Sequence, residues 1–198
     1  SVAGPNIAGI KHKAMITRNT SGEEVTVTDV DQVASDAERT FISQGNSIVH
    51  TLPQEYVVDS STGIQEPVGI SGLKLQGDFL MITSPTLALD KTKRCIERAK
   101  EKMEIEGGLV FSPLAASLAV LSEQEKKSGV ALVDIGSGTT EIAIFYKNIV
   151  RYISVLPYAG DIITADVEQG CNVSNEHAEV LKVRFGNALA SQVPFEET

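Results

Sequence analysis

Cysteine and positive charge are both scarce in this chain of 198 residues. The two cysteines, Cys95 and Cys171, form no C-x-x-C pair and lie among apolar or small residues, so we expect reduced thiols and no structural disulfide. Lysine and arginine number 17 against 26 acidic residues, which gives a net charge of −9 and a pI of about 4.8. This balance argues against a protein that binds nucleic acid or lies on an anionic membrane, because both partners require a basic surface.

The sequence also lacks several other features that would point to a class of protein. It has no apolar run of about 18 residues and no signal-peptide pattern. Its three histidines are far apart, without metal-ligand spacing, and no serine lies in a nucleophile elbow. The first residues carry no initiator methionine and have the pattern of a strand, which suggests a piece of a longer protein. Hydrophobic residues make up 42%, so we expect a packed core in one large or two small domains.

The first part of the chain mixes strands with one helix. Apolar residues at helical spacing predict a helix that begins near Thr28, with Asp31 completing a capping box, and that runs to Phe41. Alternation predicts strands over 47–59 and 73–81, and the glycine-rich stretch 60–72 is expected to be a loop.

The next part of the chain is predicted to be helical. Apolar residues at i, i+3, i+4 and i+7 predict one helix, and a proline at a favourable first position predicts a second helix over 113–124. The apolar stripe of the first helix consists of Thr92, Cys95, Ile96, Ala99 and Met103. Lysine and arginine occupy other positions of that helix and are interleaved with Glu97 and Glu101. This mixture of charges favours a solvated face over a basic docking patch.

The last part returns to strands and ends in helices. Strands are expected over 129–135, 140–146 and 149–156 and are joined as hairpins. Helices are expected over 160–169 and 175–186.

The sharpest motif for chemistry is a glycine loop between two of these strands, Asp134-Ile135-Gly136-Ser137-Gly138-Thr139-Thr140. Phosphate loops of the Rossmann and P-loop types lead into a helix, whereas this loop closes a hairpin, so the turn itself must hold a phosphate. Glycines allow positive φ and close approach of backbone N–H groups, and three hydroxyls add donors. Asp134 is placed to hold Mg²⁺ through water. An ordinary hairpin turn with glycine for geometry remains the alternative.

The stretch Val130–Ala143 resembles the second phosphate loop of the actin, sugar-kinase and heat-shock-70 ATPase superfamily. Within it, other segments resemble the FtsA family of bacterial cell-division proteins, in the same order and at similar spacing. They are His50-Thr51-Leu52-Pro53-Gln54-Glu55-Tyr56, residues 67–72, Pro157-Tyr158-Ala159-Gly160-Asp161 and the helix 178–184.

The resemblance implies an α/β, actin-like (ribonuclease-H-like) ATPase fold, incomplete, with a small α+β subdomain 1C. Residues 1–84 would be subdomain 1C (SHS2-like), 85–128 the second half of subdomain 1A, and 129–198 the first part of subdomain 2A. The cofactors would be ATP and Mg²⁺.

The resemblance also implies roles for site residues. Asp134 would organise the metal, and Gly136, Ser137, Gly138 and Thr139, followed by Thr140, would hold the β- and γ-phosphates. Glu179 and Lys182 would meet the ribose or base. Because they are three residues apart they share a helix face, and a surface ion pair is the alternative. Asp161 either faces the cleft or caps its helix.

The family's role implies partners and a location. Such proteins tether FtsZ to the cytoplasmic membrane at the division septum, assemble head-to-tail through 1C, and recruit later divisome proteins through 1C. In the family, FtsZ is bound through 2B and the membrane through a C-terminal helix, both absent from this stretch. Ser112 stands where brisk ATPases carry Glu or Gln to orient water, so we expect weak hydrolysis at most. A pilus-assembly relative, or an active ATPase or sugar kinase, is the alternative.

Overall fold

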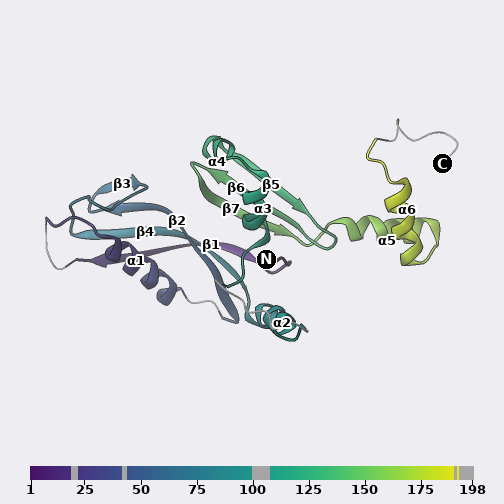
Figure 1. Cartoon of the computed structure of the whole chain (residues 1–198), viewed down its shortest axis with the longest axis horizontal. Coiled ribbons are helices and arrows are strands. Elements are labelled where there is room, and N and C mark those ends of the chain that lie inside the picture. Colours follow the sequence, from purple (N-terminus) through teal and green to yellow (C-terminus); the bar gives the residue numbers. More distant parts are fainter. Residues whose placement is uncertain (19–21, 42–43, 100–107, 190, 192–198) are drawn as a thin grey trace. The chain divides into compact units, whose positions relative to one another are not determined.

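The computed structural model describes residues 1–18, 22–41, 44–99, 108–189 and 191 (Figure 1). Contacts within the chain divide it into two compact units. The first unit comprises Ser1–Asp134 and Glu141–Val155, and the second comprises Ile135–Thr140 and Leu156–Thr198. The second unit therefore contains the glycine loop and the last two helices.

A four-stranded antiparallel sheet organises the first unit, with the strand order β1-β4-β2-β3. The strands are β1 (Ala8–Thr17), β2 (Asn46–Val58), β3 (Ser61–Ile64) and β4 (Lys74–Pro85). The two long strands predicted over 47–59 and 73–81 are confirmed. The short strand β3 lies in the stretch expected to be a loop, which is a correction. Asp59 adopts a positive φ of 53°, so the chain turns sharply there and pairs back onto β2.

Helix α1 (Val27–Thr40) covers one face of this sheet. The predicted helix is confirmed, but its cap is two residues earlier than predicted. Thr26 has extended dihedral angles and its hydroxyl accepts from the Asp29 N–H, while the Asp29 carboxylate accepts from the Thr26 N–H. The sequence offers two T-x-x-D frames, and the structure uses the one at Thr26. Val33 and Ala37 of this helix are both fully buried.

Two apolar cores lie on the two faces of the four-stranded sheet. The α1-side core contains the buried residues Ala14, Val25, Val33, Ala37, Tyr56, Val58, Leu75, Phe79 and Met81. The opposite core contains Val2, Ile7, Leu80, Ile82, Leu89, Phe111, Ala143, Phe145, Val150 and Ile153. Neighbouring positions of β4, such as Met81 and Ile82, serve opposite cores because side chains alternate along a strand.

A three-stranded sheet, β5 (Val130–Ile135), β6 (Thr140–Tyr146) and β7 (Ile149–Leu156), follows in chain order. Lys147 and Asn148 join β6 to β7 with positive φ angles of 54° and 60°. A two-residue turn of this kind joins antiparallel strands, so the predicted hairpin is confirmed. Its inward-facing residues, among them Ala143, Phe145 and Ile153, complete the core opposite α1.

The remaining helices are α2 (Thr86–Glu97), α3 (Ser112–Val120), α4 (Glu123–Ser128), α5 (Gly160–Cys171) and α6 (Asn175–Phe185). The single helix expected over 113–124 is two helices, because Ser122 caps a new one in a capping box with Glu125. In α2 the helical stripe ends before Ala99. Met103 of that predicted stripe, with Glu101, lies outside the described residues.

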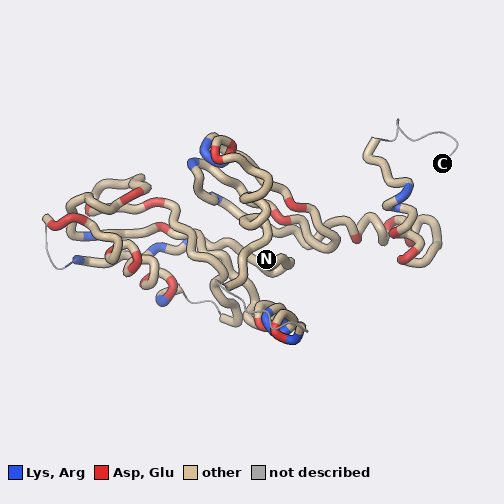
Figure 2. The backbone as a smooth tube through the Cα atoms, in the orientation of Figure 1, with Lys and Arg blue, Asp and Glu red and all other residues tan. Residues whose placement is uncertain are grey.

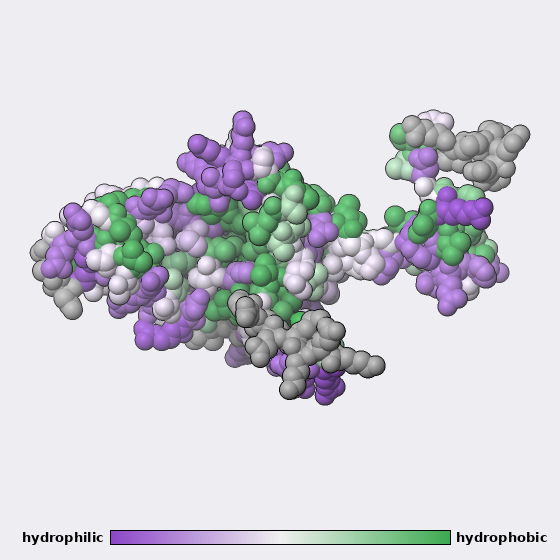
Figure 3. All heavy atoms as spheres, in the orientation of Figure 1, coloured by the Kyte–Doolittle hydropathy of each residue, from purple (hydrophilic) through white to green (hydrophobic). Residues whose placement is uncertain are grey.

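The surface bears on three sequence predictions. Helix α2 carries charges of both signs, as expected for a solvated face (Figure 2). Cys95 and Cys171 are both free and exposed. In the part of the chain that the structure describes, no helix is long and apolar enough to cross a membrane. Apolar side chains reach the surface around α3, where Leu118 is 81% exposed (Figure 3).

Candidate functional site

The glycine loop connects β5 to β6 and is closed by its own backbone. The Gly136 N–H donates to the Thr139 carbonyl at 3.0 Å. Thr140 begins β6, and its hydroxyl donates to the Tyr158 carbonyl at 2.7 Å. Of the three hydroxyls that the sequence offers a phosphate, that of Thr140 therefore donates within the protein, whereas those of Ser137 and Thr139 form no hydrogen bond with any described residue.

The loop is held against the first turn of α5. The Gly160 N–H donates to the Gly136 carbonyl at 3.1 Å, and the Asp161 N–H donates to the Ser137 carbonyl at 2.8 Å. These bonds satisfy two of the N–H groups that a helix leaves unpaired at its start. Asp161 lies in the first helical turn and does not cap the helix, since Ala159 is the N-cap residue.

The tip of the loop keeps its backbone donors open. Within the residues that the structure describes, the N–H groups of Ser137, Gly138 and Thr139 have no hydrogen-bond acceptor. Ser137 and Gly138 are exposed. Successive free N–H groups in a turn form a concave site for anions. The arrangement can hold phosphate oxygens without the help of a helix N-terminus.

The glycines of the loop allow close packing, and the positive φ that glycine also permits is not used here. Neither Gly136 nor Gly138 has a positive φ. A Cβ on Gly136 would lie 3.3 Å from the Thr139 carbonyl oxygen, which is tighter than most real contacts. A Cβ on Gly160 would lie 3.4 Å from the Gly136 oxygen and 3.6 Å from Nζ of Lys182. Small residues thus let the loop, α5 and α6 approach one another.

Helices α5 and α6 meet in a polar cluster made of Thr164, Glu179 and Lys182. Nζ of Lys182 lies 2.6 Å from Oε2 of Glu179 and donates to the Thr164 hydroxyl at 2.8 Å and to the Gly160 carbonyl at 3.2 Å. The Thr164 hydroxyl donates to Glu179 at 2.5 Å. Hydrogen bonds from Lys182 and then Thr164 lower the pKa of Glu179 below its ordinary value.

The cluster links α6 to the glycine loop. Lys182 bonds to Gly160, whose own N–H bonds to the Gly136 carbonyl, so Lys182 is connected to the phosphate loop through Gly160. The same pair is also an i,i+3 ion pair, the alternative that the sequence left open. Thr164 is buried, with 4% of its surface exposed, and sequence reasoning missed it. The sequence did contain a signal for Thr164, because it carries a hydroxyl in a helix whose other residues are mostly apolar or acidic.

Asp134 is partly buried near the end of β5 and forms no ion pair with any described residue. A lone carboxylate suits Mg²⁺, which is commonly bound by one or two carboxylates, waters and substrate phosphates. The described residues contain no group of three or more side chains that could hold a metal ion. The donor set therefore fits a Mg²⁺ ion brought by a phosphate ligand.

A second carboxylate, that of Glu141, was missed by the sequence analysis. It is 2% exposed on β6 and accepts a hydrogen bond from the Gly4 N–H at 3.0 Å. Burial raises the pKa of Glu141; the Gly4 N–H acts in the opposite direction, and the negative charge of Asp134 adds to the rise. An acid directly after Thr140 at an inward-facing strand position was the available signal.

Comparison with known proteins identifies the relatives of this chain. Residues 4–83 match the SHS2 domain inserted in FTSA, and residues 131–198 match the family of cell division protein FtsA. The cell division protein FtsA of Pseudomonas aeruginosa is 34% identical over 197 residues, covering 100% of this chain and 46% of that protein. FtsA of Escherichia coli K12 is 37% identical over 178 residues, covering 90% and 42%. The chain thus spans a little under half the length of these relatives.

A solved structure supports the fold class. The PilM-PilN type IV pilus biogenesis complex superposes with a TM-score of 0.59 at 16% identity, over 90% of this chain and 48% of that chain. The predicted α/β fold of the actin-like class is confirmed by this likeness. The higher sequence identity to FtsA makes the pilus alternative the weaker one. On the two family matches and the relatives together, the chain belongs to the FtsA family of cell division proteins.

Proposed function

We propose that this chain binds Mg-ATP through the glycine loop and helices α5 and α6, as part of a cell-division protein that works at the membrane. The observation that carries the proposal is the row of unpaired N–H groups at Ser137, Gly138 and Thr139, held against α5 by backbone hydrogen bonds. Membership of the FtsA family supports a nucleotide as the ligand.

Each site residue has a role in this proposal. The loop N–H groups and the hydroxyls of Ser137 and Thr139 would bind the β- and γ-phosphates. Asp134 would hold Mg²⁺ through its waters, and the ion would offset the negative charge of the phosphates. Glu179 and Lys182 would bind the ribose or the base with the polar atoms that now bond to each other and to Thr164.

Hydrolysis is expected to be slow. Ser112, at the start of α3, occupies the position expected to orient the attacking water, and its N–H donates to the Val2 carbonyl at 2.9 Å. A serine hydroxyl holds a water less firmly than a carboxylate or amide, which offers two oxygens or an oxygen and an NH₂ group. We therefore propose that ATP acts as a ligand that controls assembly, and not as a substrate that is turned over rapidly.

The family's role gives the wider function. We propose that the whole protein tethers FtsZ to the cytoplasmic face of the membrane at the septum and recruits divisome proteins. Residues 1–84 would be subdomain 1C, which contacts the next copy in a head-to-tail assembly and later division proteins. Residues 85–128 would belong to 1A and 129–198 to 2A. In the family, FtsZ and the membrane are bound by the 2B region and a C-terminal helix, beyond the residues matched here.

Isothermal calorimetry with Mg-ATP tests the nucleotide site. We expect a dissociation constant below about 100 μM, which corresponds to roughly 5.5 kcal/mol, and its loss in Asp134→Ala. Asp166→Ala removes the same charge from an exposed position of α5 and should leave binding unchanged. Absence of binding to the unmodified chain, or equal loss in both variants, would remove the support for a phosphate site at this loop.

A further inference from the structure

Thr164 of α5 lies at the buried centre of the polar cluster that it forms with Glu179 and Lys182. Its hydroxyl donates to Oε2 of Glu179 at 2.5 Å and accepts from Nζ of Lys182 at 2.8 Å. The Gly160 carbonyl lies farther from this hydroxyl, at 3.3 Å, so the proton goes to Glu179. A hydroxyl has one proton and two lone pairs, and Thr164 can therefore hold an acid and a base at the same time.

Lys182 has no N–H group to spare for a ligand. An ammonium carries three N–H groups. Nζ of Lys182 bonds to Glu179 at 2.6 Å, to the Thr164 hydroxyl at 2.8 Å and to the Gly160 carbonyl at 3.2 Å. A ligand that offers an acceptor would have to displace one of these three partners.

Glu179, in contrast, has one open oxygen. Thr164 and Lys182 both bond to Oε2, and Oε1 forms no hydrogen bond with any described residue. The Glu179 side chain is 47% exposed, so a ligand can reach it. Hydrogen bonds from Lys182 and then Thr164 lower the pKa of Glu179, and an ionised carboxylate only accepts. The cluster therefore offers a ligand one acceptor without the loss of an existing bond.

An open acceptor selects the part of a nucleotide that donates. The donors of ATP outside its phosphates are the ribose hydroxyls and the amino group of adenine. Gly160 connects the cluster to the glycine loop, since its carbonyl accepts from Lys182 and its N–H donates to the Gly136 carbonyl at 3.1 Å. Because the ribose lies between the phosphates and the base, its hydroxyls are the donors closer to a triphosphate bound at the loop.

We propose that Thr164 is a positioning residue that fixes Glu179 so that Oε1 accepts a ribose hydroxyl, which makes the site select ribonucleotides over deoxyribonucleotides. The contact rests on the proposed function, a nucleotide site at the glycine loop, and narrows its nucleoside end to one atom of Glu179. A glutamate loses rotamer freedom when it binds a ligand, and Thr164 and Lys182 have removed that freedom beforehand. Without the hydroxyl of the sugar, the carboxylate oxygen loses its partner.

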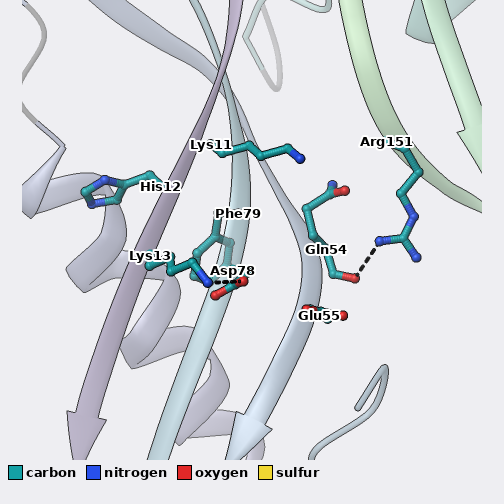
Figure 4. A pocket seen from close by; sticks show the side chains of 8 residues that line it. All are labelled: Lys11, His12, Lys13, Gln54, Glu55, Asp78, Phe79 and Arg151. Carbon is teal, nitrogen blue, oxygen red and sulfur yellow. Dashed lines mark hydrogen bonds and ion pairs between the residues drawn. The ribbon is translucent and has the colours of Figure 1, made fainter. Parts of the chain in front are cut away.

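A hollow in the first unit is the other place where an anionic ligand could bind (Figure 4). It encloses about 240 Å³, less than the roughly 300–1,000 Å³ of most ligand pockets. Nζ of Lys13 lies 2.7 Å from Asp78, so this pair of charges is already matched. Nη1 of Arg151 donates to the Gln54 carbonyl at 3.2 Å. Lys11 also lines the hollow, and Lys11→Gln tests whether nucleotide binds there.

Calorimetry with ATP, 2′-deoxy-ATP and 3′-deoxy-ATP, each with Mg²⁺, tests the ribose contact on the 198-residue chain. We expect ATP to bind about tenfold more tightly than one of the two deoxy compounds, as for a hydrogen bond to a charged acceptor. Equal binding of all three would overturn the ribose contact and leave the nucleotide site intact. Absence of ATP binding would overturn both. Weak binding of inosine triphosphate, whose base lacks the amino group, with full binding of the deoxy compounds would place Oε1 at the base and overturn the ribose contact.

Variants at position 164 test the positioning role. Thr164→Val keeps the shape of the side chain but removes the hydroxyl, so the tenfold preference for ATP should disappear, and Thr164→Ser should restore it. Thermal melting establishes that each variant is folded. A Thr164→Val chain that binds all nucleotides more weakly but keeps the preference would show a merely structural role and contradict the proposal.

Two control variants lie outside the second unit. Thr92→Val removes a hydroxyl that bonds only the Ala88 carbonyl, and Lys11→Gln removes a positive charge from the hollow in Figure 4. Both should keep the affinity for ATP and the preference over the deoxy compounds. Loss of ATP binding in Lys11→Gln but not in Thr164→Val would place the nucleotide in the hollow and overturn the role of Thr164.

Discussion

The two compact units of this chain differ in the forces that stabilise the interior of each one. The first contains two apolar cores, one on each face of its four-stranded sheet. The second has only Thr164 and Ala178 buried among its described residues, and its parts are joined by the polar bonds of Gly160, Asp161 and Lys182. Hydrophobic burial thus determines the shape of the first unit, whereas hydrogen bonds determine how the glycine loop meets α5 and α6.

This difference has a consequence for ligand binding. A unit with few buried apolar contacts opens locally at a low free-energy cost, and anything that binds its closed form stabilises it. The second unit is therefore expected to gain order from a nucleotide, while the first is expected to be the same with or without one. Four changes to the chain probe this comparison, from the largest expected effect to the smallest.

Phe79→Ala should destabilise the first unit most. Phe79 is 1% exposed in the α1-side core and packs edge-on to Tyr56 at 6.3 Å between ring centroids. Removing a fully buried phenyl ring costs about 3–5 kcal/mol of unfolding free energy. Chemical denaturation measures the loss. Leu118→Ala, at an exposed position of α3, is the control and should change stability by less than about 0.5 kcal/mol.

Gly9→Ala should disturb the packing between the two sheets of the first unit. A Cβ on Gly9 would lie 2.6 Å from Cγ1 of Ile153 and 3.2 Å from Cδ1 of Leu80, so β7 would have to shift. Overpacking of this kind costs about 1–3 kcal/mol. Gly170→Ala is the control, since nothing lies within 4 Å of its Cβ. Equal stability of the two variants would show that the sheets are not in close contact at Gly9.

Thr164→Val should loosen only the second unit. The substitution keeps the shape of the side chain but removes the hydroxyl that bonds Glu179 and Lys182. A lost buried hydrogen bond costs about 1 kcal/mol, and native-state hydrogen exchange should show faster exchange in α5 and α6 with β4 unchanged. Thr92→Val, at a partly buried position of α2, removes a hydroxyl that bonds only the Ala88 carbonyl and should change neither.

His50→Gln should change how the stability of the first unit depends on pH. The Phe111 N–H donates to Nε2 of His50, and burial lowers the pKa of His50 below its usual 6.5. The folded chain therefore binds a proton less readily than the unfolded chain, so acidification below about pH 6.5 favours unfolding. His50→Gln should lose less stability than the parent chain between pH 7.5 and 5.5. His177→Gln, at an exposed position, should match the parent.

Sequence periodicity predicted the two helices of the second unit and most, but not all, elements of the first. The helix before Phe41 and the strands over 47–59 and 73–81 follow from patterns of burial, because one face of each must leave water. The cap at Thr26 and the break at Ser122 were missed, since several short polar spacings fit a capping box and only packing selects one. Strand β3 was missed because a turn at Asp59 overrides a glycine-rich composition.

The candidate site was predicted in its residues more than in its geometry. The motif 134–140 identifies a loop that could hold phosphate, and family resemblance adds Glu179 and Lys182. No local pattern reveals that Thr164 joins those two residues, or that Gly160 and Asp161 donate to the loop carbonyls, because these bonds connect positions about 15–25 residues apart. Such contacts depend on the tertiary arrangement of loop and helices.

Hydrogen exchange with and without Mg-ATP tests the central claim most directly. If nucleotide binds the loop, exchange should slow at residues 136–140 and 160–164 and at the α6 segment that contains Lys182, while β4 in the first unit stays unchanged. Asp134→Ala should abolish the effect. Unchanged exchange at these segments under saturating Mg-ATP, or slowing that is confined to β1 and β4, would contradict a nucleotide site built from the glycine loop and helices α5 and α6.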